Sequence, residues 1–268
     1  MAHTFDERLI VNKDTKKSII YNEHLIRYGL AKKFVKGKIV LDIACGSGYG
    51  AKILAAAGAR KVVAVDIDQQ AINSAKENYY HKNIEYTAGD AEKIRKDSKT
   101  FDVVVSFETI EHLKNPDKFL SEISRVIKDE GLAIISTPNQ DVSHEKNPFH
   151  FHEFRRNEFE SIISKHFKRY KILEQNNGIA SCIAPENKLS DRTGEIIITE
   201  NGCQPIYFIA VCSKSSLSDK LNNNFDIISV NFGSLQNLYN NIGMKIADKI
   251  YSIAIKIPGV KKLLGKIK

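Results

Sequence analysis

Apolar runs and amphipathic stretches alternate along residues 38–138. Five short runs rich in β-branched residues predict strands, at 38–44, 61–67, 84–89, 101–107 and 132–138. Stretches with apolar residues at helical spacing lie among them, at 49–57, 69–80 and 116–129. Because the strands are apolar at successive positions, we expect both of their faces to be buried, as in a parallel sheet. This alternation predicts right-handed βαβ units in a doubly wound α/β fold.

The predicted helix at 116–129 has a signal at each end. Asn115 can cap its first turn, and Pro116 suits the first helical position. Gly131 follows the expected last turn. We therefore expect the helix to end just before Gly131 and the fifth strand to start directly after it.

The same patterns predict elements on both sides of these five strands. The additional helices are expected at 21–34 and 156–166, and the additional strands at 169–175 and 205–214. Residues 139–154 and 177–204 read as irregular segments, and 215–234 as a linker whose first part is polar and rich in Asn and Ser.

The last segment, 235–268, has a different composition from the rest of the chain. Residues 245–268 hold seven lysines and one aspartate, so they carry +6 of the net charge of +8, and the preceding 244 residues carry only +2. A nearly neutral body argues against a nucleic-acid-binding surface across the domain. Apolar residues recur at helical spacing in the segment and lysines occupy much of the other face. It is expected either to lie at a membrane interface or to dock on the body or a second subunit.

Cysteine usage and the N-terminus bear on the compartment. The four cysteines form no CxxC pair, which favours a reduced protein over a disulfide scaffold or a zinc site. The first 17 residues are charged and lack the apolar core of a signal peptide, and no apolar run is long enough to span a bilayer. We expect a cytoplasmic protein, with peripheral membrane contact and homodimer formation left open.

A glycine-rich turn joins the first predicted strand to the next helix. Gly46, Ser47 and Gly48 lie where backbone N–H groups at a helix start can approach a nucleotide-like ligand closely. The turn also fits the loose dinucleotide-binding pattern, which is weak on its own. Asp42, four residues before Gly46, would repel a pyrophosphate but suits a ligand with an ammonium and a sulfonium group.

Acids also end the next two strands. Asp66 ends the second, where its carboxylate can accept both ribose hydroxyls. Asp90 follows the third, where it can accept from an adenine amine. Acids at three successive strand ends predict one crevice at the point where the strand order reverses.

This series of motifs resembles the class I S-adenosylmethionine-dependent methyltransferases. The matching pieces, in order, are "VLDIACGSG", "VDID", "GDAEKI", "FDVVVSFETIEHL" and "GLAIISTPN", across residues 38–140. The flanking "FDERLI", "EHLIRY" and "NPFHFHEF" resemble bacterial methyltransferases tied to surface-glycan and O-antigen assembly. The resemblance implies a Rossmann-like sheet of seven strands, mostly parallel with an antiparallel last strand. It places the methyltransferase domain at 38–214, after an N-terminal segment at 1–37 that covers the cofactor.

The resemblance also implies which residues bind S-adenosyl-L-methionine. They are Arg27, Tyr28, Asp42, Gly46, Ser47, Gly48, Asp66, Ile67, Asp90, Ala91, Phe107 and Glu108. Asp42 and Gly46 would hold the methionine part, Gly46 through its backbone, and Gly48 would allow close approach. Asp66 would bind the ribose.

For the remaining cofactor residues, the resemblance implies contacts at the two ends of the ligand. Ile67 would pack on the adenine, and Asp90 with the Ala91 backbone would read its edge. Phe107 and Glu108 would line the methionine end. Tyr28 and Arg27, in the helix before the first strand, would cover the cofactor.

Methyl transfer to a hydroxyl also needs a base. His112 follows the fourth strand, where this fold presents its acceptor, and its ordinary pKa of ~6.5 suits neutral pH. The alternative for His112 is a helix cap or local packing. Glu111 is a second candidate, although a solvated side chain or one that bonds backbone is the simpler interpretation.

"NPFHFHEF" supplies the other acceptor-site candidates, His150, His152 and Glu153. If the segment is extended, the two histidines point the same way. They could line an acceptor pocket with Phe149 and Phe151, bind a divalent metal, or fix a lid through packing and backbone bonds. Because convergent carboxylates are not evident from the sequence, the prediction is that no metal is bound.

The sequence therefore favours an O-methyltransferase that acts on a sugar or glycan hydroxyl. A small-molecule acceptor, such as a quinol precursor or a secondary metabolite, is an alternative. A non-catalytic module that binds S-adenosylmethionine is another. A NAD-dependent oxidoreductase fits poorly, because its Tyr-x-x-x-Lys pattern occurs at Tyr28 to Lys32, before the glycine turn.

Overall fold

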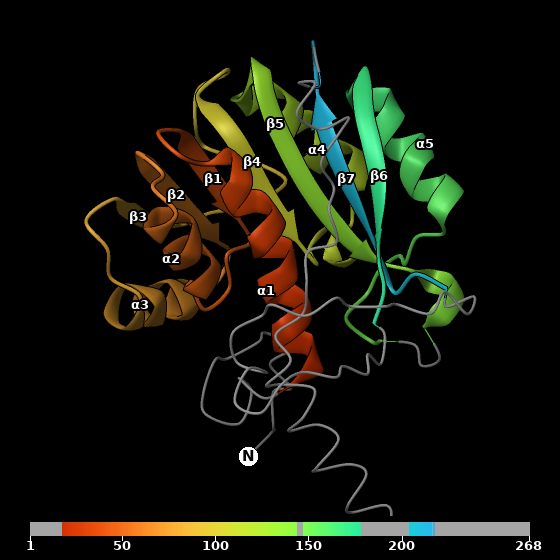
Figure 1. The fold of residues 1–268 in the computed structure, drawn as a ribbon, viewed down its shortest axis with the longest axis horizontal. Helices are drawn as coiled ribbons and strands as arrows, with labels where there is room; N and C mark the ends of the chain where they lie inside the picture. The colour runs from red at the N-terminus through yellow and green to blue at the C-terminus, as the bar shows by residue number, and fades with distance from the viewer. Residues whose placement is uncertain (1–17, 144–146, 178–203, 216, 218–268) are drawn as a thin grey trace, which may run out of the picture. The chain divides into compact units, whose positions relative to one another are not determined.

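A computed structural model describes residues 18–143, 147–177, 204–215 and 217 (Figure 1). Its contacts divide the chain into two units, Met1–Leu9 with Arg27–Ile228, and Ile10–Ile26 with Ser229–Lys268. All elements below belong to the first unit except the start of helix α1. The predicted tail at 235–268, nearly all of the linker and most of the 177–204 loop lie outside the described residues.

The described strands form one seven-stranded sheet with the order β3-β2-β1-β4-β5-β7-β6 (Figure 1). The strands are β1 Ile39–Ile43, β2 Lys61–Asp66, β3 Ile84–Ala88, β4 Phe101–Phe107, β5 Ile127–Pro138, β6 Arg169–Gln175 and β7 Tyr207–Ser213. The first five strands pair in parallel, and β7 runs antiparallel to both β5 and β6. This confirms the predicted fold. The strand order reverses at β1, which lies between β2 and β4, so the carboxyl ends of β1 and β4 flank the switch point.

Helices cover the sheet. They are α1 Ile19–Ala31, α2 Tyr49–Ala56, α3 Gln69–Asn78, α4 Pro116–Val126 and α5 Arg156–His166, with short 3-10 turns η2 Lys32–Phe34, η3 Ile110–His112 and η4 Gln140–Val142. Helices α2 and α3 pack on β2 and β3, and α5 packs on α4, β6 and β7. The predicted cap of α4 is present, because the Asn115 side chain accepts from the Lys118 N–H at 2.9 Å.

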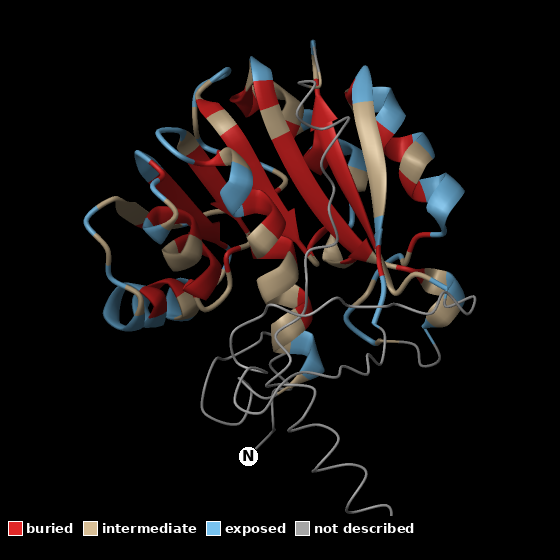
Figure 2. Cartoon of the chain, in the orientation of Figure 1, coloured by how far each residue is buried: buried red, intermediate tan, exposed pale blue. Residues whose placement is uncertain are grey.

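The core is continuous through the middle of the sheet, where Figure 2 shows the central parts of β1, β4, β5 and β7 buried. Four successive residues of β1, from Val40 to Ile43, are buried, as are the last five of β4. This agrees with the expectation that the central strands are covered on both faces. Strand β6, at one edge, is mostly half-buried.

The boundary between α4 and β5 differs from the prediction. The helix ends at Val126, and β5 begins at Ile127, which pairs with Phe101. The next pair is Val103 with Leu132, so β5 bulges over the residues between them. Gly131 lies in this bulge, where a Cβ would be 2.6 Å from Cγ1 of Ile127. The glycine is therefore required by close packing inside the strand, a reason that local sequence signals do not distinguish from a helix end.

Cys45 and Cys212 are buried free thiols, in keeping with the expected reduced state. The other two cysteines, Cys182 and Cys203, lie outside the described residues. Among the residues that the structure describes, none of the helices has the length and apolar character needed to cross a membrane.

Candidate functional site

The glycine turn after β1 takes a left-handed path. Ala44, Gly46 and Gly48 have φ angles of 60°, 53° and 86°, a region that L side chains rarely adopt. The Gly48 N–H donates to the Cys45 carbonyl at 3.0 Å and closes the turn around Gly46 and Ser47. A Cβ on Gly46 would meet nothing within 4 Å, so open space lies beside this residue. A ligand can therefore approach the backbone at Gly46.

Gly48 has a different role from the expected close approach of a ligand. A Cβ there would lie 2.6 Å from Cβ of Ala75 in α3 and 3.0 Å from the Tyr86 ring in β3. The Tyr86 hydroxyl also donates to the Gly48 carbonyl at 3.2 Å. The structure thus explains Gly48 by packing of the turn against the protein.

The third glycine, Gly50, makes room for Tyr28. A Cβ on Gly50 would fall inside the Tyr28 ring, which also packs edge-on against Phe107 at 5.0 Å and Tyr49 at 5.7 Å between ring centres. The Tyr28 hydroxyl donates to Oδ1 of Asp42 at 3.2 Å. Tyr28 was expected to cover the cofactor. Its buried ring instead lies beneath the turn and holds the Asp42 carboxylate.

Asp42 is buried at the carboxyl end of β1. Its Oδ2 has no hydrogen-bond partner among the described residues, and only 1% of the residue is exposed. Burial raises the pKa of Asp42 to about 7, the hydrogen bond from Tyr28 lowers it, and the Asp66 carboxylate raises it further. An orphaned carboxylate in this position is suited to a cationic group, which would favour its charged form.

Asp66 ends β2 and organises the backbone around the turn. Its Oδ2 accepts from the Gly46 N–H at 2.8 Å, and its Oδ1 accepts from the Asp68 N–H at 3.1 Å. The Gly46 N–H is thus already engaged. The contribution that the Gly46 backbone can still make to a cationic ligand is its carbonyl oxygen.

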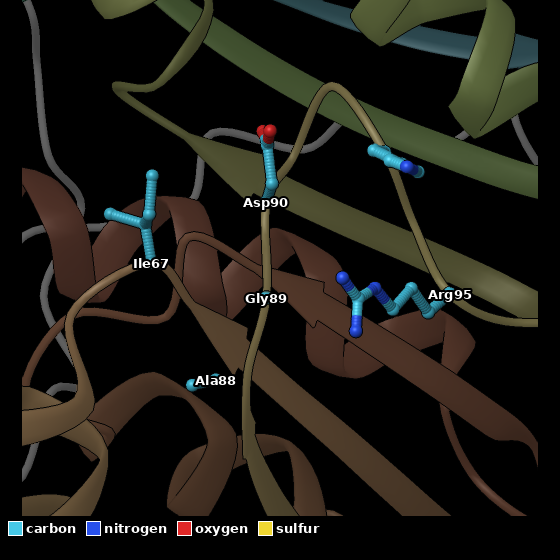
Figure 3. A pocket seen from close by; sticks show the side chains of 6 residues that line it. Ile67, Ala88, Gly89, Asp90 and Arg95 are labelled. Atoms are coloured by element: carbon cyan, nitrogen blue, oxygen red, sulfur yellow. The ribbon is translucent and has the colours of Figure 1, made fainter.

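A pocket lies beyond the ends of β2 and β3. Its lining residues are Ile67, Ala88, Gly89, Asp90, Lys93 and Arg95. Figure 3 shows the Ile67 and Asp90 side chains rising from neighbouring strand ends. Ile67 is 77% exposed, so its apolar side chain is open to contact by a flat ligand. Ala91 is buried, so only its backbone could contact such a ligand.

Lys93 and Arg95 were not predicted as part of this pocket. The Lys93 N–H donates to the Asp90 carbonyl at 3.0 Å, and this tight turn brings the following residues back to the pocket. Lys93 stands inside the "GDAEKI" motif, but its place on the pocket wall depends on the turn, which the motif alone does not reveal.

Phe107 ends β4, the strand beside β1 that carries Asp42, and Glu108 directly follows it. Phe107 is buried against Tyr28. Glu108 has a φ of 52°, and its Oε1 accepts from the Ser136 hydroxyl at 2.7 Å. A non-glycine residue in this region carries about 1–3 kcal/mol of strain and occurs preferentially at functional sites.

Glu111 and His112 lie on the short turn η3 after β4. Glu111 is fully buried, so the expectation of a solvated side chain is wrong. Its Oε2 accepts from the Thr137 hydroxyl at 3.2 Å, and its carbonyl accepts from the N–H groups of Phe151 and His152. Burial and the nearby Glu108 carboxylate raise the pKa of Glu111 well above its usual range.

His112 presents one ring nitrogen to the acceptor side. Its Nδ1 lies 3.1 Å from the Phe149 carbonyl oxygen, which can only accept, so Nδ1 donates. In the neutral ring, Nε2 then carries the lone pair. This nitrogen lies 4.0 Å from Oε1 of Glu111, and 29% of the side chain is exposed. The geometry fits a proton acceptor.

The structure brings His150 into this cluster and leaves His152 out of it. The segment turns at His150 and is not an extended strand, so the two histidines do not point the same way. The His150 ring packs edge-on against His112, 4.7 Å between centres, and its Nδ1 is 2.7 Å from Oε1 of Glu153. His152 packs on Phe154 and is half exposed.

Arg27 lies with the last two strands. Its guanidinium packs over the Tyr207 ring, 4.2 Å from the centre, and donates to Gln175 at 3.0 Å. The side chain is fully buried, yet Nε and Nη2 have no partner among the described residues. Its described contacts therefore put Arg27 beside β6 and β7, and its covering of the cofactor stays a prediction.

Comparisons with known proteins show which proteins the sequence of this chain is similar to. Residues 41–135 match the family model described as a methyltransferase domain. A Mycobacterium tuberculosis protein named "Probable S-adenosylmethionine-dependent methyltransferase" is 32% identical over 162 residues, 59% of this chain and 58% of that protein. A Coxiella burnetii "Ubiquinone biosynthesis O-methyltransferase" is 35% identical over 108 residues, 40% of this chain and 46% of that protein. The chain thus spans roughly half the length of the curated relatives it matches.

A solved structure supports the fold independently. A protein from Pyrococcus horikoshii OT3 superposes with a TM-score of 0.56 at 21% identity, over 74% of this chain and 92% of that one. Residues 41–135 are therefore similar to a methyltransferase domain, and the solved structure supports the Rossmann-like fold. The Mycobacterium tuberculosis relative is named for its dependence on S-adenosyl-L-methionine.

The residues present fit this cofactor. The orphaned Oδ2 of Asp42 and the open space at Gly46 suit the cationic methionine part. The exposed Ile67 and the Asp90 carboxylate suit a base with an exocyclic amine. The remaining predicted residues lie on neighbouring elements. Asp66 ends β2, Ser47 lies in the turn after β1, Phe107 ends β4, and Glu108 follows it.

Proposed function

We propose that this protein transfers a methyl group from S-adenosylmethionine to a hydroxyl of a sugar or glycan. One observation carries the chemistry. Asp42, with an orphaned carboxylate oxygen, ends β1, and Glu111 and His112 follow β4, the strand paired with β1. A site for a cation and a proton acceptor thus lie at neighbouring strand ends, the arrangement that methyl transfer to oxygen requires.

In this proposal, each part of the cofactor has its own set of residues. Oδ2 of Asp42 and the Gly46 carbonyl accept from the ammonium group, and Tyr28 holds Asp42 in place. Asp66 binds the ribose with the lone pairs left by its two backbone bonds, while Ile67, Asp90 and the Ala91 backbone bind the base. When bound, the cofactor supplies a methyl group already activated on sulfonium sulfur.

The acceptor side follows from the Glu111–His112–His150 cluster. Nε2 of His112 would take the proton of the acceptor hydroxyl, and the bound S-adenosylmethionine would supply the methyl group. Arg27, with two orphaned donors, and the exposed Phe149 and Phe151 rings are available to position the acceptor. Exposed aromatic rings offer flat apolar faces to a sugar ring.

A hydroxyl acceptor is supported by the name of one relative, an O-methyltransferase. That relative's name also favours the second candidate, a small phenolic or quinol-type acceptor. The glycan acceptor itself rests on the resemblance of the flanking segments to glycan-associated methyltransferases.

The proposal extends to the location of the enzyme. The domain boundaries 38–214, the linker 215–234 and the tail 235–268 are taken from the sequence. The basic tail would hold the enzyme at the cytoplasmic face of an anionic membrane. Pelleting with anionic liposomes that is lost on deletion of 235–268 would support this. Weak pelleting that is unchanged by the deletion would refute it.

The experiment for the acceptor is transfer of labelled methyl from S-adenosylmethionine into a cell extract, fractionated into glycan, lipid-linked, small-molecule and macromolecular pools. Asp42→Asn serves as the blank. Label in the glycan or lipid-linked pool supports the proposal, and label only among small molecules favours the second candidate. Binding of S-adenosylhomocysteine without transfer to any pool would instead indicate a non-catalytic module.

A further inference from the structure

Three potential ligand atoms converge beside the proposed acceptor site. Glu111, His112 and His150 each offer one nitrogen or carboxylate oxygen, and these atoms all lie within 4.8 Å of one another. Glu111 and His112 come from η3, whereas His150 comes from the segment after β5. The cluster is formed only by the fold, because 37 positions separate the two histidines.

Glu111 and His112 face each other through one oxygen and one nitrogen atom. Since Nδ1 of His112 donates to the Phe149 carbonyl, Nε2 presents a lone pair in the neutral ring. It faces Oε1 of Glu111 at 4.0 Å, too far for a hydrogen bond. Oε1 is buried and has no hydrogen-bond partner among the described residues. A cation bound beside Oε1 would therefore pair with the charged form of Glu111 and could also bind the lone pair of His112.

His150 has the supporting contact that metal-binding histidines usually have. Its Nδ1 lies 2.7 Å from Oε1 of Glu153, which fixes a donor at Nδ1 and a lone pair at Nε2. In the present structure Nε2 is 3.0 Å from the Asn147 side-chain amide. That amide, whose Oδ1 also accepts from the Phe149 N–H at 3.0 Å, must turn aside for His150 to bind an ion.

The frame of the cluster is fixed by hydrogen bonds. Thr137 holds the second carboxylate oxygen of Glu111 at 3.2 Å. The Phe151 N–H donates to the Glu111 carbonyl at 2.8 Å and ties the His150 segment to η3. Tetrahedral ligand atoms about 2.1 Å from an ion lie ~3.4 Å apart, so ligand atoms that now lie up to 4.8 Å apart need to approach one another by up to about 1.4 Å.

We propose that Glu111, His112 and His150 bind one divalent first-row transition-metal ion, of the Zn²⁺ or Co²⁺ kind. Two imidazoles and one carboxylate favour such an ion over Mg²⁺ and Ca²⁺, which prefer all-oxygen sites. Three protein ligands leave coordination positions open for a further ligand. This revises the prediction from sequence that no metal is bound, because the buried Glu111 supplies the carboxylate that the sequence did not reveal.

The role of the ion, unlike its binding, rests on the proposed function. An acceptor hydroxyl at an open position would have a lowered pKa and release its proton to solvent. His112 would then act as a ligand, and no longer as the base. Nε2 of His112 cannot bind a metal and accept the hydroxyl proton at the same time. Whether methyl transfer requires a metal therefore distinguishes the two roles.

The test is calorimetric titration of the full-length, chelator-treated protein with Zn²⁺, without cofactor or acceptor. We expect one equivalent to bind, at least 100-fold more tightly than Mg²⁺. Glu111→Gln, His112→Gln and His150→Gln should each weaken binding at least tenfold. His152→Ala, from the same segment but outside the cluster, is the matched control and should leave the affinity unchanged.

Folding and the proposed function are checked separately. Each variant must retain the wild-type thermal midpoint within a few degrees and bind S-adenosylhomocysteine, so that weakened Zn²⁺ binding reports the ligands. Wild-type protein that binds S-adenosylhomocysteine but no Zn²⁺, or cluster variants that bind Zn²⁺ as tightly as wild type, would overturn the metal site. Zn²⁺ binding without methyl transfer to any acceptor would leave the metal site standing and count against the proposed function alone.

Discussion

The hydroxyl of Tyr28 donates to Oδ1 of Asp42 at 3.2 Å and leaves Oδ2 without a partner among the described residues. Helix α1 thereby fixes the acid at the end of β1, and Gly50 makes this contact sterically feasible. The bond satisfies Oδ1 of Asp42, so Oδ2 is the oxygen that remains to accept a hydrogen bond from a ligand. Burial of the Asp42 carboxylate with one oxygen unpaired lowers the stability of the folded protein. Such groups are common in binding sites.

Tyr28→Phe should weaken S-adenosylmethionine binding about three- to tenfold at pH 7. The substitution removes the hydrogen bond that lowers the Asp42 pKa, while the ring still packs on Gly50 and Phe107. Calorimetric titration measures the change, with Tyr170→Phe on β6 as the control. An affinity equal to that of wild type would show that the bond does not prepare Asp42 for the cofactor.

Cofactor affinity should depend on pH through Asp42. Its pKa is about 7, raised by burial, so the carboxylate is protonated below that pH and loses its attraction for a cation. We expect affinity to fall up to tenfold per pH unit below about pH 7 and to level off above it. Titrations between pH 5.5 and 8.5 should show this slope in wild type, and a weak, flatter profile in Asp42→Asn. Equal slopes in both proteins would assign the pH dependence to another group.

Asp42 should also make the cofactor-free protein less stable at higher pH. Because its folded pKa lies above its value of 3.8 in an unfolded chain, the folded state holds the proton longer, and stability falls as pH rises from about 4 to about 7. Asp42→Asn should therefore raise the thermal midpoint by several degrees at pH 8 and change it little at pH 4. Differential scanning calorimetry at the two pH values provides the check. A midpoint lowered at pH 8 would contradict this account.

Two glycines of the turn should respond differently to alanine. Gly48→Ala places a methyl group 2.6 Å from Ala75 and should reduce the free energy of unfolding by about 2–4 kcal/mol. Gly46→Ala meets open space and should cost only about 1 kcal/mol for its left-handed φ, yet weaken cofactor binding at least tenfold. Urea unfolding and ligand titration separate the two effects. Reversed results would mean that Gly48, and not Gly46, faces the ligand.

The strands and the acids at their ends were predictable because both depend on local patterns. Continuous apolar runs marked β1 and β4, and Asp42 and Asp66 follow from their place at strand ends. Gly131 was misread because a glycine after a helix and a glycine in a bulge look alike in sequence.

The acceptor side was less predictable because its residues meet only through the fold. Glu111 carries no sequence signal of burial, and its neighbours Thr137 and Phe151 come from β5 and the segment after it. The separation of His150 from His152 depends on a turn where an extended segment was considered. Tertiary contacts of this kind are not encoded in the spacing of a single motif.

The central claim is that the strand ends around Asp42 bind S-adenosylmethionine. Its most direct test is equilibrium titration of the full-length protein with S-adenosylmethionine at pH 8, with NAD as a competitor and Asp42→Asn in parallel. The account predicts one site of micromolar affinity, no displacement by NAD, and at least tenfold weaker binding in the variant. Absence of binding, displacement by NAD, or unchanged affinity in Asp42→Asn would contradict it.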